Sequence, residues 1–243
     1  MNSLCCFLLR CHGILMLAAF TIASAAAVPP QPIAKKGTLI FSDDFERAEL
    51  GDKWKVTTPT FVIADGVLRC SQTKPEHGAV GRVDIGQKNL VLEFKFRFEG
   101  ATNINAVCND RAYKEGHAGH ICRVTLSAKG IMLGDDKERM THAIEEMKKD
   151  PARQTEVAKL TAGRTATIPM KLEEHRWYRL SLELVGDEMR VSLDDKAVGY
   201  LKSSGIAHPI KSDFHFTVSG NATQFALFDD VRVWAAGRAE AKP

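Results

Sequence analysis

The stretch that decides the fold is residues 175–234, HRWYRLSLELVGDEMRVSLDDKAVGYLKSSGIAHPIKSDFHFTVSGNATQFALFDDVRVW. Its apolar side chains recur at every second position in three runs, which are Tyr178, Leu180, Leu182 and Leu184, then Met189, Val191 and Leu193, then Phe214, Phe216 and Val218. Because side chains of a strand alternate between its two faces, each run predicts a strand with one buried and one solvated face. Gly186-Asp187 separates the first two runs and suits a hairpin turn. Such strands pack most simply against a second sheet, so the stretch predicts a β-sandwich.

The chain before this stretch supplies further strands. The clearest is residues 90–98, where leucines and phenylalanines alternate with Val91, Glu93, Lys95 and Arg97. The others expected are residues 38–42, a hairpin at residues 61–70 with its turn at Asp65-Gly66, and a hairpin made of residues 121–126 and 131–135. These strands predict an all-β domain over residues 38–236.

The first 27 residues have the layout of a secretory signal peptide. Arg10 supplies positive charge, residues 14–22 form a short apolar core, and Ala25-x-Ala27 supplies small residues for cleavage. The apolar run is too short for a membrane span, although a membrane-anchored N-terminus remains the alternative. We therefore expect a secreted or periplasmic protein that begins near Val28, with no membrane span in the mature chain. Residues 28–37 read as a Pro-containing linker, and residues 237–243 as a flexible tail.

Charge and cysteine content exclude some classes of function. The 33 basic and 30 acidic residues are nearly balanced and form no block of like charge, so we expect no nucleic-acid partner. Three cysteines follow the signal peptide, Cys70, Cys108 and Cys122, so at least one cannot pair within the chain. Cys108 and Cys122 end neighbouring strand-like segments and are the better candidates for a disulfide. The alternative is three small buried apolar side chains.

Residues 136–162 interrupt the strand pattern with a helical insertion. Met140, Ala143, Ile144 and Met147 fall at helical spacing on one face, and Asp150-Pro151 ends that helix. A second, shorter helix is expected at residues 152–160. The insertion is interpreted either as a structural flap, docked on the sandwich through its methionine face, or as a lid over a binding face.

Several motifs resemble a known family. They are DDF-x-R at residues 43–47, LG-x-x-W at 50–54, DGVLR at 65–69, W-Y-R-L-x-L-E-x-x-GD at 177–187 and F-DDV-R-V-W at 228–234. Together they resemble the secreted bacterial 3-keto-disaccharide hydrolase family over nearly all of residues 38–235. The resemblance implies a concanavalin A-like jelly roll of two antiparallel sheets, with carbohydrate as ligand or substrate. Because the motifs are mostly strand and turn residues, they identify the fold better than the chemistry.

The same fold houses the laminarinase-type family 16 glycosidases, which need Glu-x-Asp-x-x-Glu on one strand. That spacing places both glutamates in one groove at the separation that retaining chemistry requires. No segment of this chain has it. Glu145-Glu146 and Glu173-Glu174 lie in a predicted helix and at the start of a loop. We therefore do not expect hydrolysis by that mechanism.

One unusually polar segment, NDRAYKEGHAGH at residues 109–120, holds the candidate catalytic residues His117 and His120. A 3-keto sugar would be broken by elimination, which needs a base near the ring proton and a positive or metal-bound partner for the ketone. Imidazole is the side chain suited to both tasks. Asp110 and Arg111 of the same segment are candidates to hold sugar hydroxyls. The alternative is that both histidines are simply solvated.

Hairpin register adds Asp135 to the candidate catalytic residues. If residues 127–130 make the turn, Leu126 pairs with Ile131, Val124 with Leu133 and Cys122 with Asp135. The next pair outward would bring His120 close to Asp135 or Asp136. A carboxylate there would fix the tautomer of the imidazole and raise its basicity. A one-residue bulge would break this register.

Aromatic side chains are the remaining candidates for sugar binding. Trp177 is out of phase with the buried row of its strand and therefore faces away from the core. Tyr113 and Trp54 are weaker candidates. An outward tryptophan packed under a loop is the alternative interpretation.

No cofactor is certain from the sequence, and the one metal to consider is a divalent cation such as calcium. Asp43-Asp44 and Asp229-Asp230 lie near the first and last strands, and their carboxylates suit that ion. The alternative is that they are ordinary acids of turns and strand ends.

Three functions remain open at this point. The first is an exported enzyme that cleaves a glycosidic bond of an oxidised (3-keto) disaccharide or related glycan. The second is a non-catalytic glycan-binding module, and the third is an envelope scaffold with no sugar site. An enzyme predicts clustered titratable groups in the groove, whereas a binding module predicts aromatic side chains with few acids.

Overall fold

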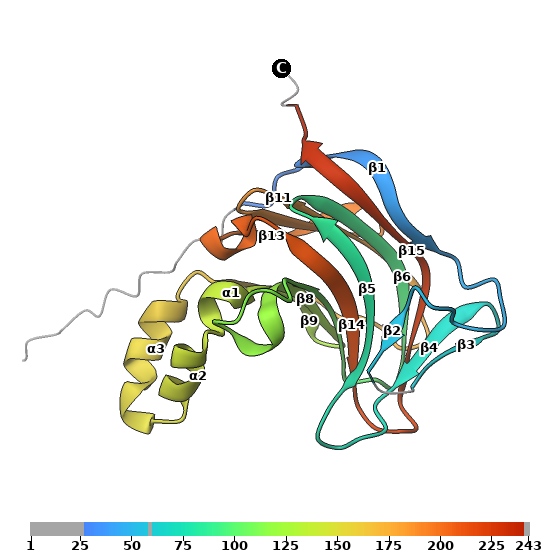
Figure 1. Cartoon of the computed structure of the whole chain (residues 1–243), viewed down its shortest axis with the longest axis horizontal. Helices are drawn as coiled ribbons and strands as arrows, with labels where there is room; N and C mark the ends of the chain where they lie inside the picture. Colours follow the sequence, from blue (N-terminus) through green and yellow to red (C-terminus); the bar gives the residue numbers. More distant parts are fainter. Residues whose placement is uncertain (1–26, 58–59, 241–243) are drawn as a thin grey trace, which may run out of the picture.

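The structure is a computed structural model that describes residues 27–57 and 60–240. Two antiparallel sheets pack face to face around one apolar core, with three short helices at one side (Figure 1). This arrangement confirms the predicted all-β sandwich with a short helical insertion.

The first sheet, named here the β6 sheet after its central strand, has eight strands. Their order is β13-β12-β11-β6-β15-β4-β3, and β1 also pairs with β15. The strands are β1 (Ala34–Asp43), β3 (Phe61–Ala64), β4 (Val67–Ser71), β6 (Leu90–Glu99), β11 (Tyr178–Val185), β12 (Glu188–Leu193), β13 (Lys196–Lys202) and β15 (Phe225–Arg238).

The second sheet, named here the β14 sheet, has seven strands in the order β10-β9-β8-β7-β14-β5-β2. Its strands are β2 (Lys55–Val56), β5 (Ala79–Gln87), β7 (Asn103–Asn109), β8 (His120–Ser127), β9 (Gly130–Asp135), β10 (Thr165–Pro169) and β14 (Lys211–Ser219). Figure 1 shows β5 and β14 bowed, so that this sheet has a concave outer face. One helical turn at His117–Gly119 precedes β8, and another at Ser204–Ala207 precedes β14.

Aromatic side chains from both sheets fill the core. Phe216 of the β14 sheet stacks on Phe228 of the β6 sheet with ring centroids 4.1 Å apart. Phe94 meets Phe216 edge to face at 4.9 Å. Burying a side chain of this kind contributes roughly 1.5–3 kcal/mol, so the alternating phenylalanines are the main apolar link between the sheets.

The register expected for the β8–β9 hairpin is confirmed. Leu126 pairs with Ile131, Val124 with Leu133 and Cys122 with Asp135. Gly186 adopts a positive φ of 61° in the turn between β11 and β12, as a tight hairpin requires. The outer end of β8 departs from expectation, because a register shift lies between the pairs Cys108–Cys122 and Asn109–His120.

Residues 28–37 were expected to form a linker, but most of them belong to the folded domain. β1 begins at Ala34, and the side chain of Ile33 is buried. The carboxylate of Glu183 accepts hydrogen bonds from the backbone N–H of Ile33 (2.6 Å) and of Ala34 (2.9 Å). Arg190 pairs with the same carboxylate inside the β6 sheet. A paired buried charge therefore fastens the start of the domain.

Both chain ends lie partly outside the described residues. The predicted signal peptide falls there except for Ala27, as do the last three residues of the predicted tail. Strand β15 continues to Arg238, so the flexible part expected at residues 237–243 is shorter than predicted. In the described part of the chain, no helix has the length and apolar character needed to cross a membrane.

The helical insertion contains α1 (Asp136–Arg139), α2 (His142–Lys148), a turn at Pro151–Arg153 and α3 (Gln154–Thr161). Docking on the sandwich through the whole methionine face is found only in part, because Met140 contacts Arg123 of β8 whereas Met147 is half-buried. Only α1 makes extensive contact with the sandwich, at β8, whereas α2 packs against α3 and the pair projects to one side (Figure 1). Ile144 and Val157 are the buried side chains of these two helices, and Met147 is only half-buried.

The three cysteines of the domain are buried thiols, and the described residues contain no disulfide. Cys108 and Cys122 are direct cross-strand partners on β7 and β8, so the expected pairing places them correctly as neighbours. The adjacent Cys108 and burial raise the pKa of the Cys122 thiol, and burial alone raises that of Cys70. A thiol with a raised pKa is a poor nucleophile, so we assign Cys70 and Cys122 no chemistry.

Candidate functional site

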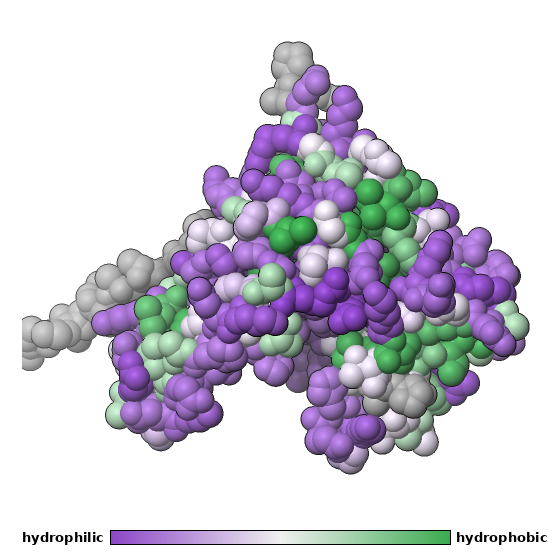
Figure 2. All heavy atoms as spheres, viewed as in Figure 1, coloured by the Kyte–Doolittle hydropathy of each residue, from purple (hydrophilic) through white to green (hydrophobic). Residues whose placement is uncertain are grey.

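The concave face of the β14 sheet carries polar side chains at alternate positions. On β14 these are Asp213, His215 and Thr217, which alternate with core phenylalanines; on β7 they are Asn105 and Asn109. Figure 2 shows the face as a recess between the lobe of α2 and α3 and the loops at the opposite end. A pocket of about 250 Å³ lies on this face, with His117, His120, His215, Asn109, Asp213 and Arg82 among its lining residues.

A bulge at the start of β8 brings His120 to this pocket. Cys122 and Ile121 both lie in the core, so two successive residues are buried where strict alternation would bury only one. The extra residue puts His120 on the outer face, where it is the cross-strand partner of Asn109. A bulge of this kind redirects a side chain at the end of a strand.

Asn109 joins two imidazoles. Nδ1 of His120 donates to Oδ1 of Asn109 (2.7 Å), while Nδ2 of Asn109 donates to Nδ1 of His215 (2.6 Å) and to Oδ1 of Asp213 (2.9 Å). Asp213 fixes this orientation of the amide, because an ionised carboxylate only accepts hydrogen bonds and must face the NH₂ group.

The two histidines therefore have opposite tautomers. His120 carries its proton on Nδ1, which leaves the lone pair of Nε2 free to accept a proton. His215 accepts at Nδ1, which leaves an N–H donor at Nε2. The two ring centroids are 5.6 Å apart. Side by side, the two rings present one unprotonated nitrogen and one hydrogen-bond donor.

Asp213 is the ionised acceptor of this hydrogen-bond network. Burial alone would raise its pKa, but the adjacent His215 and the hydrogen bonds from Asn109 and Ser212 lower the pKa overall. Its second oxygen accepts from Arg111 at 2.9 Å. The predicted site residue Arg111 thus lines the pocket, where it also pairs with Asp84 at 2.6 Å. The carboxylate of Asp213 stays ionised and holds the orientation of the amide.

His120 is held in its neutral form. Burial lowers the pKa of His120 to about 3, and the nearby positive charge of Arg123 and the rings of His215 and His117 add to the effect. The ring of His117 lies 5.3 Å from that of His120 in a turn where Ala118 adopts a positive φ of 50°. The structure therefore brings the two predicted histidines together, and one of them remains unprotonated at neutral pH.

Asp135 is not part of this cluster, so its predicted role beside His120 is wrong. Its side chain is 0% exposed, and it caps α1 by accepting from the N–H of Glu138. It also accepts from Ser203 Oγ (2.5 Å) and Gly205 N (2.9 Å). The cause is the bulge, because Asp135 shares the core side with Cys122 while His120 points to the opposite face.

Asp110 and Tyr113 are engaged within the protein and do not line the pocket. Asp110 accepts from Nε2 of His208 at 2.8 Å, and the hydroxyl of Tyr113 donates to the carbonyl of Lys137 at 3.2 Å. Trp177 is only half-buried, in line with the prediction, but it directly precedes β11 of the β6 sheet, where Arg97 lies 5.2 Å from its ring. It cannot join the histidines in one groove, since the two sheets face opposite ways.

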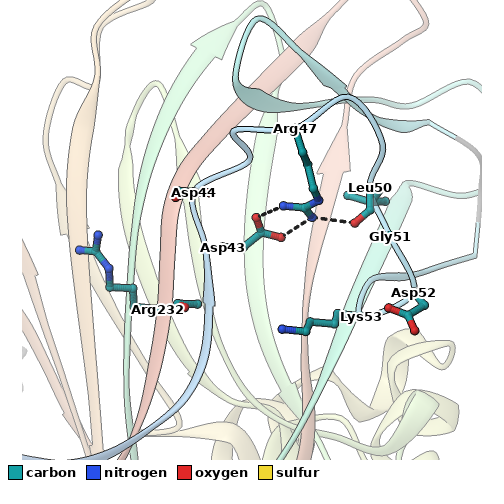
Figure 3. Close-up of a pocket in the computed structure, with 9 residues that line it drawn as sticks. Asp43, Asp44, Arg47, Leu50, Gly51, Asp52, Lys53 and Arg232 are labelled. Atoms are coloured by element: carbon teal, nitrogen blue, oxygen red, sulfur yellow. Dashed lines mark hydrogen bonds and ion pairs between the residues drawn. The ribbon is translucent and has the colours of Figure 1, made fainter.

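The expected calcium ligands are occupied by the protein itself. Asp43 accepts from Arg47 (2.5 and 2.7 Å), from Trp54 Nε1 (2.8 Å) and from the N–H of Phe45 (2.9 Å). Figure 3 shows Arg47 reaching Asp43 and the carbonyl of Leu50 beside a cavity of about 410 Å³. The DDF-x-R and LG-x-x-W motifs are therefore structural. Hydrogen bonds from Arg47, Phe45 and Trp54 outweigh burial and lower the pKa of Asp43.

The second pair of acids is engaged as well. Lys95 contacts both Asp229 (3.3 Å) and Asp230 (2.6 Å) on the outer face of the β6 sheet. Within residues 27–57 and 60–240, no three His, Cys, Asp or Glu side chains are grouped so as to hold a metal ion.

Sequence reasoning missed His215, Asp213 and Arg82. The signal was present, because Asp213 and His215 alternate with Phe214 and Phe216 and must therefore face outward. The sequence does not show which strands are neighbours in the sheet. Asn109 and His215 are 106 positions apart, and only the pairing of β7 with β14 brings them together.

Comparison with known proteins supports the fold. No family model and no curated protein matches the sequence. Among solved structures, a family GH16 endo-β-1,3(4)-glucanase, SCLam, has a TM-score of 0.58 at 12% identity over 87% of this chain and 99% of its own. The carbohydrate-binding module CBM66 from Bacillus subtilis has a TM-score of 0.50 at 14% identity over 75% and 96%.

A sialidase has a TM-score of 0.53 at 13% identity over 75% of this chain, but the match spans only 17% of the sialidase. At these identities the likeness shows the fold, a concanavalin A-like jelly roll of two antiparallel sheets.

Proposed function

We propose that this protein acts on carbohydrate in the pocket of the β14 sheet and cleaves a glycosidic bond of a 3-keto sugar by elimination. The observation that carries the proposal is the pair of opposite tautomers that Asn109 imposes on His120 and His215. The jelly-roll neighbours, whose names describe a glucanase and a carbohydrate-binding module, support carbohydrate as the ligand. The sequence motifs that resemble the 3-keto-disaccharide hydrolase family support the class of substrate.

The chemistry follows from the two ring nitrogens. Nε2 of His120 takes the proton from C2 of the sugar, next to the C3 ketone, and the electron pair of the C–H bond forms an enolate. The N–H of His215 donates a hydrogen bond to the enolate oxygen, which stabilises the developing negative charge. The enolate then collapses to form a C1–C2 double bond, the C1–O glycosidic bond breaks, and the departing alkoxide takes a proton from the His120 imidazolium.

A second candidate is a glycan-binding module with no turnover. It is favoured by a ladder of neutral polar groups beside the histidines, in which Asn105 donates to Thr217 (2.8 Å) and accepts from Thr125 (2.6 Å). Such amide and hydroxyl groups bind sugar hydroxyls without chemistry. Binding of this kind does not depend on the tautomer of either histidine, so variants of His120 distinguish a binding module from an enzyme.

The test is an assay of the mature chain with a disaccharide oxidised at C3, followed by ultraviolet absorbance of the enone product and by release of free sugar. We expect His120→Gln to lower turnover by about 10²–10⁴-fold, the usual contribution of a general base. The matched control is His142→Gln, because His142 is exposed on α2. Binding without turnover in the parent protein would favour the binding module, and no binding would favour a scaffold.

A further inference from the structure

Arg82 and Arg123 flank the centre of the concave face in one row across the sheet. Arg82 on β5 is the cross-strand partner of His215 on β14. On the other side of β14, His215 pairs with Val107 of β7, and Val107 pairs with Arg123 of β8. Consecutive strands lie about 4.8 Å apart, so the two arginines bracket the pocket from opposite sides. Both line it, as do the histidines.

Most of the charges around this pocket neutralise one another. Arg123 pairs with the buried carboxylate of Asp136. Arg111 pairs with Asp84 and Asp213, and Lys55 also pairs with Asp84 at 2.5 Å. The acidic groups of this face therefore already have basic partners within the protein.

Arg82 differs from these residues. No acidic group in the described part of the chain lies within ion-pair distance of its guanidinium, and its Nε is buried without a hydrogen-bond partner. The side chain as a whole is only half-buried, so its positive charge lines the pocket without an acidic partner. A ligand with an anionic oxygen supplies that partner at the terminal N–H groups.

We propose that the pocket is selective for a sugar that carries an anionic group, a ring carboxylate or a sulfate, seated against Arg82. The inference rests on the proposed function, because it assumes that a sugar occupies this pocket. A planar guanidinium binds two oxygens of such a group with two parallel hydrogen bonds. Arg82 adjoins His215 in the row, so the anionic substituent lies beside the imidazole that donates to the reacting ketone.

The experiment compares three ligands that cannot be turned over: methyl glucoside, methyl glucuronide and the 6-sulfate of methyl glucoside. Affinities are measured by calorimetry, and NMR shifts of the histidine side chains report binding in the pocket. We expect the parent protein to bind at least one anionic ligand about tenfold more tightly than the neutral glucoside, with a gap that narrows at high salt. The carboxylate and sulfate arms identify which oxyanion is preferred.

The variants are Arg82→Gln and Arg82→Lys. We expect Arg82→Gln to abolish the preference, so that the anionic and neutral glycosides bind with equal affinity. We expect Arg82→Lys to retain part of the preference, since the charge stays but the two-oxygen contact is lost. The matched control is Arg69→Gln. Arg69 lies on the β6 sheet over the ring of Phe225, at 3.6 Å, and also has no ion pair with a described residue. Arg82→Lys keeps the test decisive if Arg82→Gln fails to fold.

Different results overturn the two proposals. Equal affinity for neutral and anionic glycosides, or a preference that survives Arg82→Gln, overturns the role of Arg82 and leaves the proposed carbohydrate function standing. Failure of all three ligands to shift the histidine signals overturns both. Loss of the preference in Arg69→Gln would place the anion on the other sheet and overturn the assignment of this pocket.

Discussion

At the scale of single residues, a side-chain amide determines what each imidazole can do. The amide of Asn109 contacts the ionised carboxylate of Asp213 and the rings of His215 and His120. Only one orientation of the amide satisfies all three contacts. The chemistry of this site therefore depends on a residue that itself exchanges no proton.

Replacing Asn109 with leucine tests this dependence. Asn109→Leu removes the partner of Nδ1 in both His120 and His215, so we expect both rings to become mixtures of tautomers. It also removes a donor to Asp213, and each buried group left without its partner should lower the free energy of unfolding by about 1–3 kcal/mol. Long-range ¹H–¹⁵N NMR of the imidazoles measures the tautomers. Unchanged tautomers in a folded Asn109→Leu protein would contradict the assignment.

The depressed pKa of His120 predicts a pH dependence of stability. The folded-state pKa is about 3 and the ordinary value is 6.5. Between these values the unfolded state binds a proton that the folded state does not, so this group destabilises the fold as pH falls through that window. The slope is at most about 1.4 kcal/mol per pH unit.

The measurement is urea unfolding of the parent protein and of His120→Gln at pH 7, 5.5 and 4. The stability of the parent should fall more steeply than that of the variant, because carboxylates common to both cancel in the difference. If the stabilities of the parent and the variant fall in parallel with pH, burial does not lower the pKa of His120.

At the scale of elements, the β8–β9 hairpin shows how far sequence reasoning reaches. The register set by a turn at residues 127–130 predicted the partners of Cys122, Val124 and Leu126, and all three pairs are confirmed. The predicted register failed at the next residue outward, because Ile121 is buried beside Cys122. Nothing in the local sequence distinguishes a bulge from a regular strand at this point, so Asp135 was placed in the wrong cluster.

The helical insertion shows a similar limit. Helical spacing predicted α2 and α3, but the spacing of apolar residues does not tell which partner covers them. In the structure α2 and α3 pack against one another, and α1 is anchored to the sandwich by the pair of its buried Asp136 with Arg123 of β8. The helices α2 and α3 thus form a small unit of their own.

This packing predicts local rather than global unfolding. Ile144→Ala should remove apolar contacts within the helical pair and speed hydrogen exchange there, while the melting temperature of the sandwich changes little. Exchange measured by mass spectrometry over residues 142–161 and over β14 tests this, with Ala143→Ser on the exposed side of α2 as the control. Equal acceleration in β14 would mean that the helices and the sandwich unfold together.

At the scale of the whole molecule, the fold was the most predictable property. Alternating runs of five to nine residues, repeated along the chain, admit few arrangements other than two packed sheets. The site was less predictable, since its residues come from β5, β7, β8 and β14, which are distant in sequence. The two histidines in a polar loop were found because they lie close together, whereas His215 was hidden among phenylalanines.

Export remains our proposal for the whole protein, and the N-terminus tests it. Mature protein recovered from its host should begin at or near Val28, which retains the carbonyl of Pro29 that accepts from Arg190 at 2.9 Å. Removing residues 28–33 should then lower the free energy of unfolding by a few kcal/mol, because it strips backbone partners from a buried ion pair. N-terminal sequencing and urea unfolding are the measurements. Met1 on the secreted form would contradict export.

The pairing of β1 with β15 has a consequence for synthesis. The first strand of the domain lies against the last, with Ala34 opposite Arg238, so the β6 sheet cannot close until both have been made. A topology with such distant partners folds slowly, because the chain must form a long loop before these contacts stabilise it. A ribosome-bound chain of this protein therefore keeps the β6 sheet open until residue 238 has been made, as the proposed export in an unfolded form would require.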